Sequence, residues 1–422
     1  MRARCLLTMP EYAGTLAAVR CLGEHGVEVT VAGTDLLAPA RWSKHTARFV
    51  RCPDPRNSDR FLAWLLAFGD ANPGYFLYPT SDDLAWLFAA NAAELGKRFV
   101  LYQPPVATLV RLLDKRKLYA ACEEVGLGTV KTWFPQTEAE VVALEPTLPF
   151  PVMIKPRTQV MLETMNKGEL VLEPRDLLPR YSAFVAKEHY LPPALADFGD
   201  VSRPMLQAFH LRASDGIYSV GGFIDREGQL LGVRASRKIL QRPRKIGVGL
   251  CFEAAELHQE VAEGITRLCR AVGYFGLFEV ELIAENGRFL LIDFNPRLYG
   301  QIGFDIARGL PLPLFAYLAA TGNEEGLRAQ AEAARAPAPT TAIYCDRFAL
   351  DLLLLVRRLA GTTSAEERRR WRSWLAAHRD TTTDATFAEG DRLPGLVHAA
   401  SNLVRSARYA RGYYFTSVRD PA

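Results

Sequence analysis

The sequence predicts a mixed α/β and α+β fold with more than one domain. Residues 4–102 alternate short apolar runs with amphipathic ones, residues 275–300 carry the pattern of a β-hairpin, and residues 341–422 are mostly helical in pattern. A chain of 422 residues is too long for one ordinary core, and its 49% share of hydrophobic residues is sufficient for two or three cores.

The amino-terminal region predicts a small parallel sheet with helices on both faces. The expected strands cover residues 4–9, 27–32, 75–78 and 99–102, and the expected helices cover residues 12–25, 60–68 and 83–95. Binding residues often follow the strands of such sheets, here in residues 10–14 and 79–83. For Ser81-Asp82 a plain helix N-cap is an equally good interpretation. The chain has no G-x-G-x-x-G motif, so a dinucleotide site is not expected.

Composition excludes several function classes. With 51 basic and 47 acidic residues, the chain has no overall charge that would favour nucleic acid. Its seven cysteines are scattered singly, which argues against a disulfide framework or a zinc site and predicts a reducing, cytoplasmic location. No apolar run approaches the ~20 residues of a membrane span, and the amino terminus lacks the apolar core of a signal peptide.

Two lysines occupy positions where a lysine is unexpected. Lys115 lies in the first turn of an expected helix over residues 112–125, where the helix dipole favours an acidic residue. Lys155 ends the apolar strand that begins at Phe150, and an ammonium group buried there needs an anion as partner. For Lys115 a solvated helix position is the alternative.

The middle of the chain predicts further strands. Residues 201–211 predict a strand and hinge between two α+β halves, and residues 217–225 and 230–236 predict a hairpin. Six basic residues follow within positions 234–245, for which a solvated face or a polyanion patch is the ordinary interpretation. A helix over residues 256–272 then leads to the hairpin.

The hairpin over residues 275–300 contains the most informative residues. Its strands are expected at residues 277–283 and 288–294, and side chains alternate along each strand, so Glu281 and Glu279 share a face. A two-residue turn at Asn286-Gly287 would set Glu281 opposite Ile292. We expect instead a three-residue loop, Glu285-Asn286-Gly287 with Gly287 left-handed, which sets Glu281 opposite Leu291 and beside Asp293.

Three side chains of this hairpin form a candidate metal site. Glu281, Asp293 and Asn295 offer hard oxygen ligands without nitrogen or sulfur, which suits Mg²⁺ or Mn²⁺ on nucleotide phosphates rather than zinc. Arg297 follows, and its planar fork can bind a carboxylate or phosphoryl group beside the metal. The alternative is an edge hairpin with solvated carboxylates.

The pattern of Glu281 with Asp293-Phe294-Asn295-Pro296-Arg297 resembles the metal-binding hairpin of the ATP-grasp superfamily, which more often has glutamate in place of Asp293. The segments Asp114-Lys115 and Pro151–Pro156 and the hinge resemble other motifs of that family in the same order. Further stretches resemble its subset of D-aspartate-ligase-like carboxylate-amine ligases, namely Pro79–Asp82, Arg41–His45 and Gly390–Pro394.

The resemblance implies a domain plan. A Rossmann-like domain would cover residues 1–110, the small ATP-grasp lobe residues 111–205, the metal-binding lobe residues 206–330 and a helical carboxy-terminal extension residues 331–422.

The resemblance also implies roles for single residues. Lys115 and Lys155 would contact the nucleotide phosphates, and either Arg237 or Lys238, with a slight preference for Lys238, would hold the γ-phosphate. Lys167, in the glycine-poor loop over residues 158–168, would add a charge contact. The adenine-binding hinge would consist of Leu206, Gln207, Ala208 and Phe209. The acidic residue that usually binds the ribose is missing after this hinge.

The activity implied is an ATP-dependent ligation of a carboxylate to an amine. The carboxylate would become an acyl phosphate, stabilised by Arg297, and the amine would then form an amide with release of ADP and phosphate. ATP and Mg²⁺ or Mn²⁺ are the expected cofactors. The expected partners are a small-molecule carboxylate and amine, with no nucleic acid, no membrane, and a homodimer left open. The alternatives are a carboxylase or carbamoyl-phosphate-type enzyme, and a nucleotide- or polyanion-binding protein without turnover.

Overall fold

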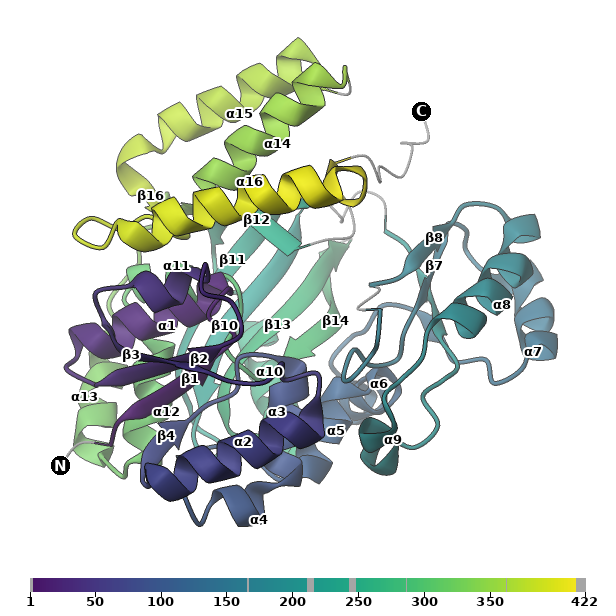
Figure 1. Cartoon of the computed structure of the whole chain (residues 1–422). Coiled ribbons are helices and arrows are strands. Elements are labelled where there is room, and N and C mark those ends of the chain that lie inside the picture. Colours follow the sequence, from purple (N-terminus) through teal and green to yellow (C-terminus); the bar gives the residue numbers. More distant parts are fainter. Residues whose placement is uncertain are drawn as a thin grey trace.

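A computed structural model describes the chain as three sheets with helices packed around them (Figure 1). The described residues are 3–164, 167–210, 216–242, 248–285, 287–361 and 363–414.

The amino-terminal region forms a five-stranded parallel sheet in the order β3-β2-β1-β4-β5, which confirms the predicted parallel sheet. Leu7 packs toward α1 and α12, while Leu6 packs toward α2 and α3, so helices cover both faces. The edge strand β3 was not predicted, because its side chains are partly or fully exposed and form no apolar run. The elements are β1 (Cys5–Thr8), α1 (Ala13–Glu24), β2 (Val29–Gly33), η1 (Pro39–Trp42), β3 (Thr46–Arg51), α2 (Ser58–Ala71), β4 (Tyr75–Leu77), α3 (Asp82–Ala90), α4 (Ala92–Leu95), β5 (Phe99–Leu101) and α5 (Val106–Leu113).

The second region is a small lobe built on an antiparallel sheet in the order β6-β9-β7-β8. Val152, Ile154 and Leu206 form its core together with side chains of α7 and α8. Figure 1 shows these helices on the outer side of the lobe. The elements are α6 (Lys115–Glu124), β6 (Thr132–Trp133), α7 (Glu138–Leu144), η2 (Glu145–Thr147), β7 (Val152–Lys155), β8 (Glu169–Val171), η3 (Pro174–Asp176), α8 (Leu177–Lys187), α9 (Pro192–Phe198) and β9 (Met205–Ala208).

The third region is a seven-stranded sheet in the order β14-β13-β10-β11-β12-β15-β16, antiparallel except for the last pair. The hairpin predicted over residues 217–236 is present, but its second strand continues to Arg242 and pairs with β12, which was not predicted. The elements are β10 (Ile217–Ile224), β11 (Leu230–Arg242), β12 (Val248–Ala255), α10 (Gln259–Val272), β13 (Gly276–Glu285), β14 (Arg288–Asn295), α11 (Ile302–Ala307), α12 (Leu312–Ala320), α13 (Glu324–Ala333), β15 (Ile343–Cys345), η4 (Arg379–Thr381) and β16 (Thr382–Asp384).

The β13–β14 hairpin has a shorter connection than expected. Glu285 pairs with Arg288, so two residues join the strands and the prediction of a three-residue loop is wrong. Asn286 lies outside the described residues, and Gly287 is left-handed as predicted, with φ 76°.

A shift of register in this hairpin aligns its two acidic side chains. Leu282 pairs with Leu291, but the next residue, Glu281, pairs with Asp293 rather than with Leu291 as expected. Ile292 is therefore an extra residue in β14, which is the definition of a β-bulge. The bulge sets Glu281 and Asp293 directly opposite each other.

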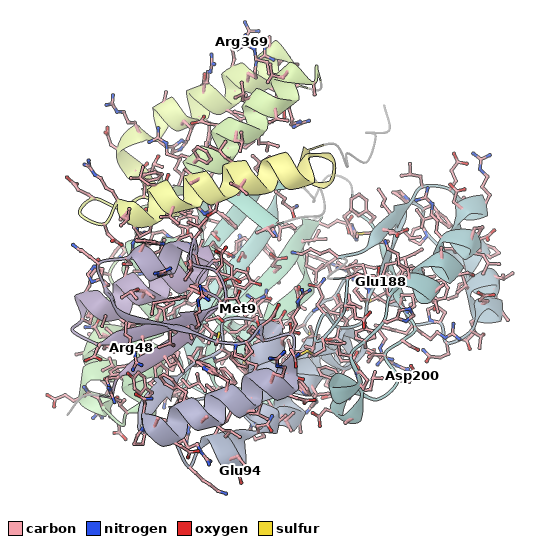
Figure 2. The ribbon with its side chains drawn as sticks, in the orientation of Figure 1. Met9, Arg48, Glu94, Glu188, Asp200 and Arg369 are labelled. Carbon is pink, nitrogen blue, oxygen red and sulfur yellow. The ribbon has the colours of Figure 1, made fainter. Side chains whose placement is uncertain are left out.

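The carboxy-terminal region is not purely helical, because β15 and β16 extend the large sheet. Its helices are α14 (Arg347–Leu359), α15 (Ala365–Ala377) and α16 (Leu393–Tyr414). The basic stretch 366–372 lies on α15, and Figure 2 shows Arg369 pointing away from the rest of the molecule, as predicted for a surface helix.

The carboxy-terminal region is fastened to the amino-terminal domain through Asp391. Arg20 of α1 donates from Nε to Asp391 Oδ2 at 2.8 Å, and Ser43 donates from Oγ to the same atom at 2.8 Å. The backbone N–H of Lys44 donates to Asp391 Oδ1 at 2.9 Å. The stretches Arg41–His45 and Gly390–Pro394, far apart in sequence, therefore contact each other. No helix in the described ranges has the length and apolarity needed to cross a membrane.

Candidate active site

The β13–β14 hairpin presents two opposed carboxylates, and each one pairs with a lysine. Lys238 of β11 donates from Nζ to Glu281 Oε1 at 2.6 Å. Lys115, the first residue of α6, forms an ion pair with Asp293 Oδ1. Burial alone would raise the pKa of Asp293, but the charges of Lys115 and Lys155 lower it overall. Asp293 therefore stays ionised at neutral pH.

Asn295 lies beside this pair and is oriented by a buried carboxylate. Its Nδ2 donates to Glu279 Oε2 at 2.6 Å, and its Oδ1 accepts from Arg297 Nη2 at 2.7 Å. Glu279 also accepts hydrogen bonds from Ser219 Oγ and, at 2.9 Å, from Gln301 Nε2. Burial raises the pKa of Glu279 to about 7. These hydrogen bonds determine the orientation of the Asn295 amide, whose nitrogen faces Glu279 and whose oxygen faces Arg297.

The donor set of the hairpin fits a hard divalent cation. Glu281, Asp293 and Asn295 offer oxygen atoms on one face, and such ligands suit Mg²⁺ or Mn²⁺. Over the described ranges of the chain, no group of three His, Cys, Asp or Glu side chains is arranged for a metal. The candidate centre thus consists of two carboxylates and an amide.

Arg297 is held by the amino-terminal domain. Its Nε donates to Asp82 Oδ1 at 2.9 Å, and its Nη1 donates to the carbonyl oxygen of Leu298 at 3.1 Å. Asp82 begins α3, the helix that follows β4 in the chain. The phenol of Tyr12, after β1, lies within electrostatic reach of Arg297, Asp82 and Asp83. The two strand ends predicted to carry binding residues therefore meet the metal hairpin at Arg297.

A buried ion pair fixes the start of α6. Arg157 donates from Nη2 to Asp114 Oδ2 at 2.6 Å and from Nε to Asp114 Oδ1 at 3.3 Å. Asp114 is fully buried and also caps α6 by accepting from the backbone N–H of Arg116 at 3.0 Å. The backbone N–H of Lys115 donates to the Arg157 carbonyl oxygen at 2.9 Å. Because Arg157 follows β7 by two residues, the pair holds Lys115 close to Lys155.

Lys155 leaves β7 on the face opposite to the small-lobe core. Val152 and Ile154 point into that core, so the alternation of the strand turns Lys155 away from it. Its Nζ donates to Gln207 Oε1 at 3.3 Å, and it has no ion-pair partner among the described residues. Desolvation lowers the pKa of Lys155 to about 8, although the charge of Asp293 opposes this shift. A bound anion would stabilise the ammonium form of such a desolvated lysine.

The four predicted hinge residues have different surroundings. Leu206 is buried in the small-lobe core, so only its backbone is open to a ligand on the other face. Gln207 donates from Nε2 to Tyr119 OH at 2.9 Å and to Thr132 Oγ1 at 3.1 Å. The backbone N–H of Phe209 donates to the carbonyl oxygen of Pro151 at 3.1 Å.

Ala208 belongs to an apolar cluster between the hinge and the large sheet. The cluster consists of Val130, Ala208, Ile217, Ile283, Leu290 and Ile292. It lies on the same hairpin as the carboxylates, because Ile283 follows Glu281 by two residues on the same face of β13.

Of the two candidates on β11, only Lys238 reaches the site. Lys238 is 5% exposed and contacts Glu281, whereas Arg237, on the opposite face of the strand, is exposed to solvent. The expectation that Arg237 takes part is therefore corrected by the alternation of the strand. The exposed Lys167 lies within electrostatic reach of Lys238, Glu281 and Asp293. Arg244, Lys245 and residues 165–166 lie outside the described residues.

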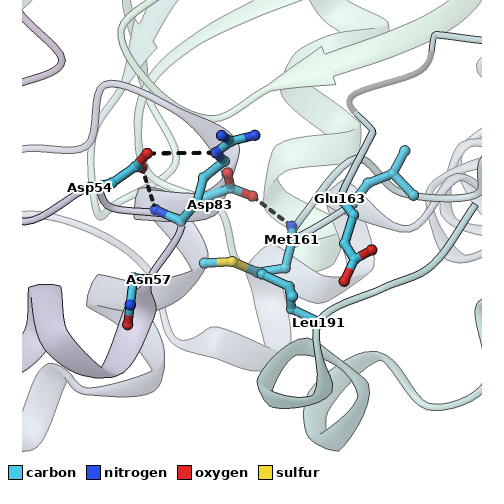
Figure 3. Close-up of a pocket in the computed structure, with 8 residues that line it drawn as sticks. Asp54, Asn57, Asp83, Met161, Glu163 and Leu191 are labelled. Carbon is cyan, nitrogen blue, oxygen red and sulfur yellow. Dashed lines mark hydrogen bonds and ion pairs between the residues drawn. The ribbon is translucent and has the colours of Figure 1, made fainter.

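A cavity of about 320 Å³ lies between the amino-terminal domain and the loop over residues 158–168 (Figure 3). Asp83 Oδ1 accepts a hydrogen bond from the backbone N–H of Met161 at 2.6 Å, and burial raises the pKa of Asp83 to about 6. Met161 is left-handed, with φ 54°. Asp83, next to Asp82, thus ties this loop to the domain that also holds Arg297. The cavity is lined by Asp54, Arg56, Asn57, Asp83, Met161, Leu162, Glu163 and Leu191.

Sequence reasoning missed three contributors to the site. Glu279 was placed on the same face as Glu281, but no role in the site was predicted for it. Arg157 has a weak signal, as a second basic residue just after β7. The pairing of Asp82 with Arg297 joins residues 215 positions apart, and no local pattern indicates it.

Comparisons with known proteins show which folds and sequences the chain is similar to. No protein-family model matches the chain. Over 297 residues the chain is 23% identical to D-aspartate ligase of Enterococcus faecium (strain Aus0004). The matched stretch covers 67% of this chain and 68% of that protein.

Two solved structures show the same fold. One is an L-amino acid ligase from Bacillus licheniformis, with TM-score 0.56, 15% identity and coverage of 76% of this chain and 75% of the other. The other is the biotin carboxylase domain of Hydrogenobacter thermophilus 2-oxoglutarate carboxylase in complex with MgADP, ADP and bicarbonate, with TM-score 0.59, 16% identity and coverage of 76% and 70%.

Proposed function

We propose that this chain, a member of the ATP-grasp superfamily, is an ATP-dependent ligase that joins a carboxylate to an amine. One observation carries the proposal. Lys115 and Lys155, from the small lobe, converge on Glu281 and Asp293 of the large sheet, with Arg297 at one end of the hairpin. The lysines that could bind phosphate, the carboxylates that could bind a metal and the guanidinium that could bind an oxyanion are therefore adjacent.

The nucleotide would lie between the hinge and the large sheet. The apolar cluster around Ile283 would contact the base, and the backbone of residues 206–209 would offer hydrogen-bonding groups. Toward the other end of the hairpin, Lys155 would bind phosphate, because it is desolvated and lacks an ion-pair partner in the described chain. Lys115 and Lys238 would add charge on either side.

Glu281, Asp293 and Asn295 would hold Mg²⁺ or Mn²⁺. When bound, the ion would neutralise phosphate charge and orient the phosphates. Glu279 would act on this centre indirectly, by keeping the Asn295 oxygen turned toward it.

The reaction would proceed in two steps. A carboxylate oxygen of the first substrate attacks the γ-phosphorus, the bond to ADP breaks, and an acyl phosphate forms. The amine then attacks the acyl carbon, phosphate leaves, and the amide forms with loss of a proton from nitrogen. The lysines would stabilise charge on the transferring group in the first step.

Arg297 would stabilise the acyl phosphate. A guanidinium has five N–H donors, and three of them contact Asp82, Asn295 and Leu298. The donors that remain are held in a fixed plane by these contacts, which suits recognition of an oxyanion. The strand ends around Tyr12 and Asp82 would border the acyl group and the incoming amine.

The experiment is an ADP-release assay with panels of carboxylates and amines, in which hydroxylamine serves as a trap for acyl phosphates. We expect ADP release that depends on one class of carboxylate, with hydroxamate formed in equal amount. The variant Glu281→Gln/Asp293→Asn serves as the control and should be inactive but folded. ADP release without hydroxamate or amide would contradict the proposal.

A carboxylase or carbamoyl-phosphate-type activity is the second candidate, because the fold likeness to a biotin carboxylase domain is as close as the likeness to an L-amino acid ligase. Bicarbonate is then the carboxylate that is activated. ADP release that requires bicarbonate and no other carboxylate would favour this candidate.

A further inference from the structure

The two carboxylates of the candidate metal centre are neutralised by lysines of the same chain. Lys238 lies 2.6 Å from Glu281, and the side chains of this pair are 6% and 20% exposed. Lys115 contacts Asp293, and the side chains of this pair are 12% and 38% exposed. Water therefore has little access to either ammonium group.

The charges around the centre do not balance. Arg297 is paired with Asp82. Among the described residues, the other charged groups that interact here are four lysines and three carboxylates, which leaves a surplus of one positive charge. These groups are Lys115, Lys155, Lys167, Lys238, Glu279, Glu281 and Asp293.

We propose that Lys115 and Lys238 are resident counter-ions of the metal centre, so that Glu281 and Asp293 accept a divalent cation only together with a nucleotide. This inference rests on the proposed function, because it requires nucleotide phosphates at the lysines. The phosphates draw both ammonium groups off the carboxylates, and the freed carboxylate oxygens then become available to the cation.

The reason is the cost of leaving a buried charge without a partner. If a cation displaced the lysines in the absence of phosphate, two poorly hydrated ammonium groups would lose their ion pairs next to an added positive charge. With phosphate present, each lysine exchanges one anion for another. Coupling between two ligands is reciprocal, so the metal should strengthen nucleotide binding by the same factor.

The test measures Mn²⁺ binding to nucleotide-free protein by the electron paramagnetic resonance signal of free Mn²⁺. Wild type should bind Mn²⁺ weakly at this centre. Lys238→Met frees Glu281, and Lys115→Met frees Asp293, so each variant should bind Mn²⁺ at least about tenfold more tightly. Lys97→Met is the matched control, because Lys97 pairs with Glu94 on the surface, where the two side chains are 64% and 54% exposed. It should bind Mn²⁺ like wild type.

Two further measurements separate the explanations. Adding Glu281→Gln to Lys238→Met should abolish the gain, which locates the new Mn²⁺ site at the hairpin. Equal Mn²⁺ affinity of wild type and both folded lysine variants would overturn the inference. Calorimetric titration of wild type with MgADP tests the proposed function by itself. Absence of MgADP binding would reject that function, whereas normal MgADP binding with tight metal binding to nucleotide-free wild type would reject only the counter-ion role.

Discussion

Nucleotide binding near pH 8 should be accompanied by proton uptake at Lys155. In the ligand-free structure, desolvation lowers the pKa of this lysine to about 8. About half of the molecules therefore carry a neutral Lys155 at pH 8, and about a tenth at pH 7. A bound phosphate favours the ammonium form and raises the pKa again. Binding of MgADP should thus take up ~0.5 proton per site at pH 8 and ~0.1 at pH 7.

The assay is isothermal titration of the protein with MgADP in buffers that differ in ionisation enthalpy. The slope of the observed enthalpy against the buffer enthalpy gives the number of protons taken up. The sign follows from the direction of the shift: uptake appears as pH rises toward the pKa of the free lysine, and it vanishes near pH 6, where Lys155 is already protonated.

Two substitutions at the same position sharpen the assay. Lys155→Met should remove the proton uptake and weaken binding of MgADP. Lys155→Arg should keep much of the affinity without uptake, because arginine stays protonated throughout this pH range. Uptake at pH 8 that persists in Lys155→Met would refute the reasoning, as would tight MgADP binding by wild type with no uptake.

Three further predictions concern groups that support the site. Asp82→Asn should slow hydroxamate formation by about 10- to 100-fold with little change in calorimetric MgADP affinity, because it loosens Arg297 alone; a normal rate would remove Asp82 from the mechanism. Asp114→Ala should lower the free energy of unfolding in urea by about 3–5 kcal/mol, since it leaves the buried guanidinium of Arg157 without its carboxylate partner. The exposed pair Asp70–Arg98 provides its control, where Asp70→Ala should cost about 1 kcal/mol or less. The pKa of Asp83 is raised to about 6 in the folded protein, so between about pH 4 and pH 6 the folded protein binds a proton that the unfolded chain has already lost. The contribution of Asp83 to the free energy of unfolding should therefore fall as pH rises from about 4 to about 6. Asp83→Asn should flatten that part of the stability profile, and an unchanged slope would show that another group causes it.

Local patterns in the sequence predicted the parts of the site that depend on local rules. Alternation along β14 placed Asp293 and Asn295 on one face, and alternation along β7 turned Lys155 out of the small-lobe core. The expected position of Glu281 beside Asp293 is correct, but it results from the bulge and not from the predicted loop. The parallel sheet followed from alternating strands and helices.

The parts that were missed depend on pairing between distant or weakly patterned segments. The bulge at Ile292 lies in the middle of a strand, and nothing in the residues of β14 distinguishes it from a regular strand with a longer loop. Leu206 carries the expected apolar side chain, but this side chain packs into the small-lobe core and does not face the hinge. Asp82 reaches Arg297 only because two domains meet, and that contact exists in the tertiary fold alone.

The pairing of β15 with β12 bears on where the chain can be cut. Without the residues after the predicted boundary at 330, β12 would become the outer strand of its sheet, and its backbone groups now paired with β15 would face solvent. The side chains of Leu250 and Cys251 would also lose their cover from Leu350 and Leu353 of α14. An uncovered strand with an apolar face is a template for pairing with another chain. A shortened protein ending there should therefore self-associate, and sedimentation would show this as particles heavier than one chain, whereas a shortened protein that sediments as a monomer would contradict it.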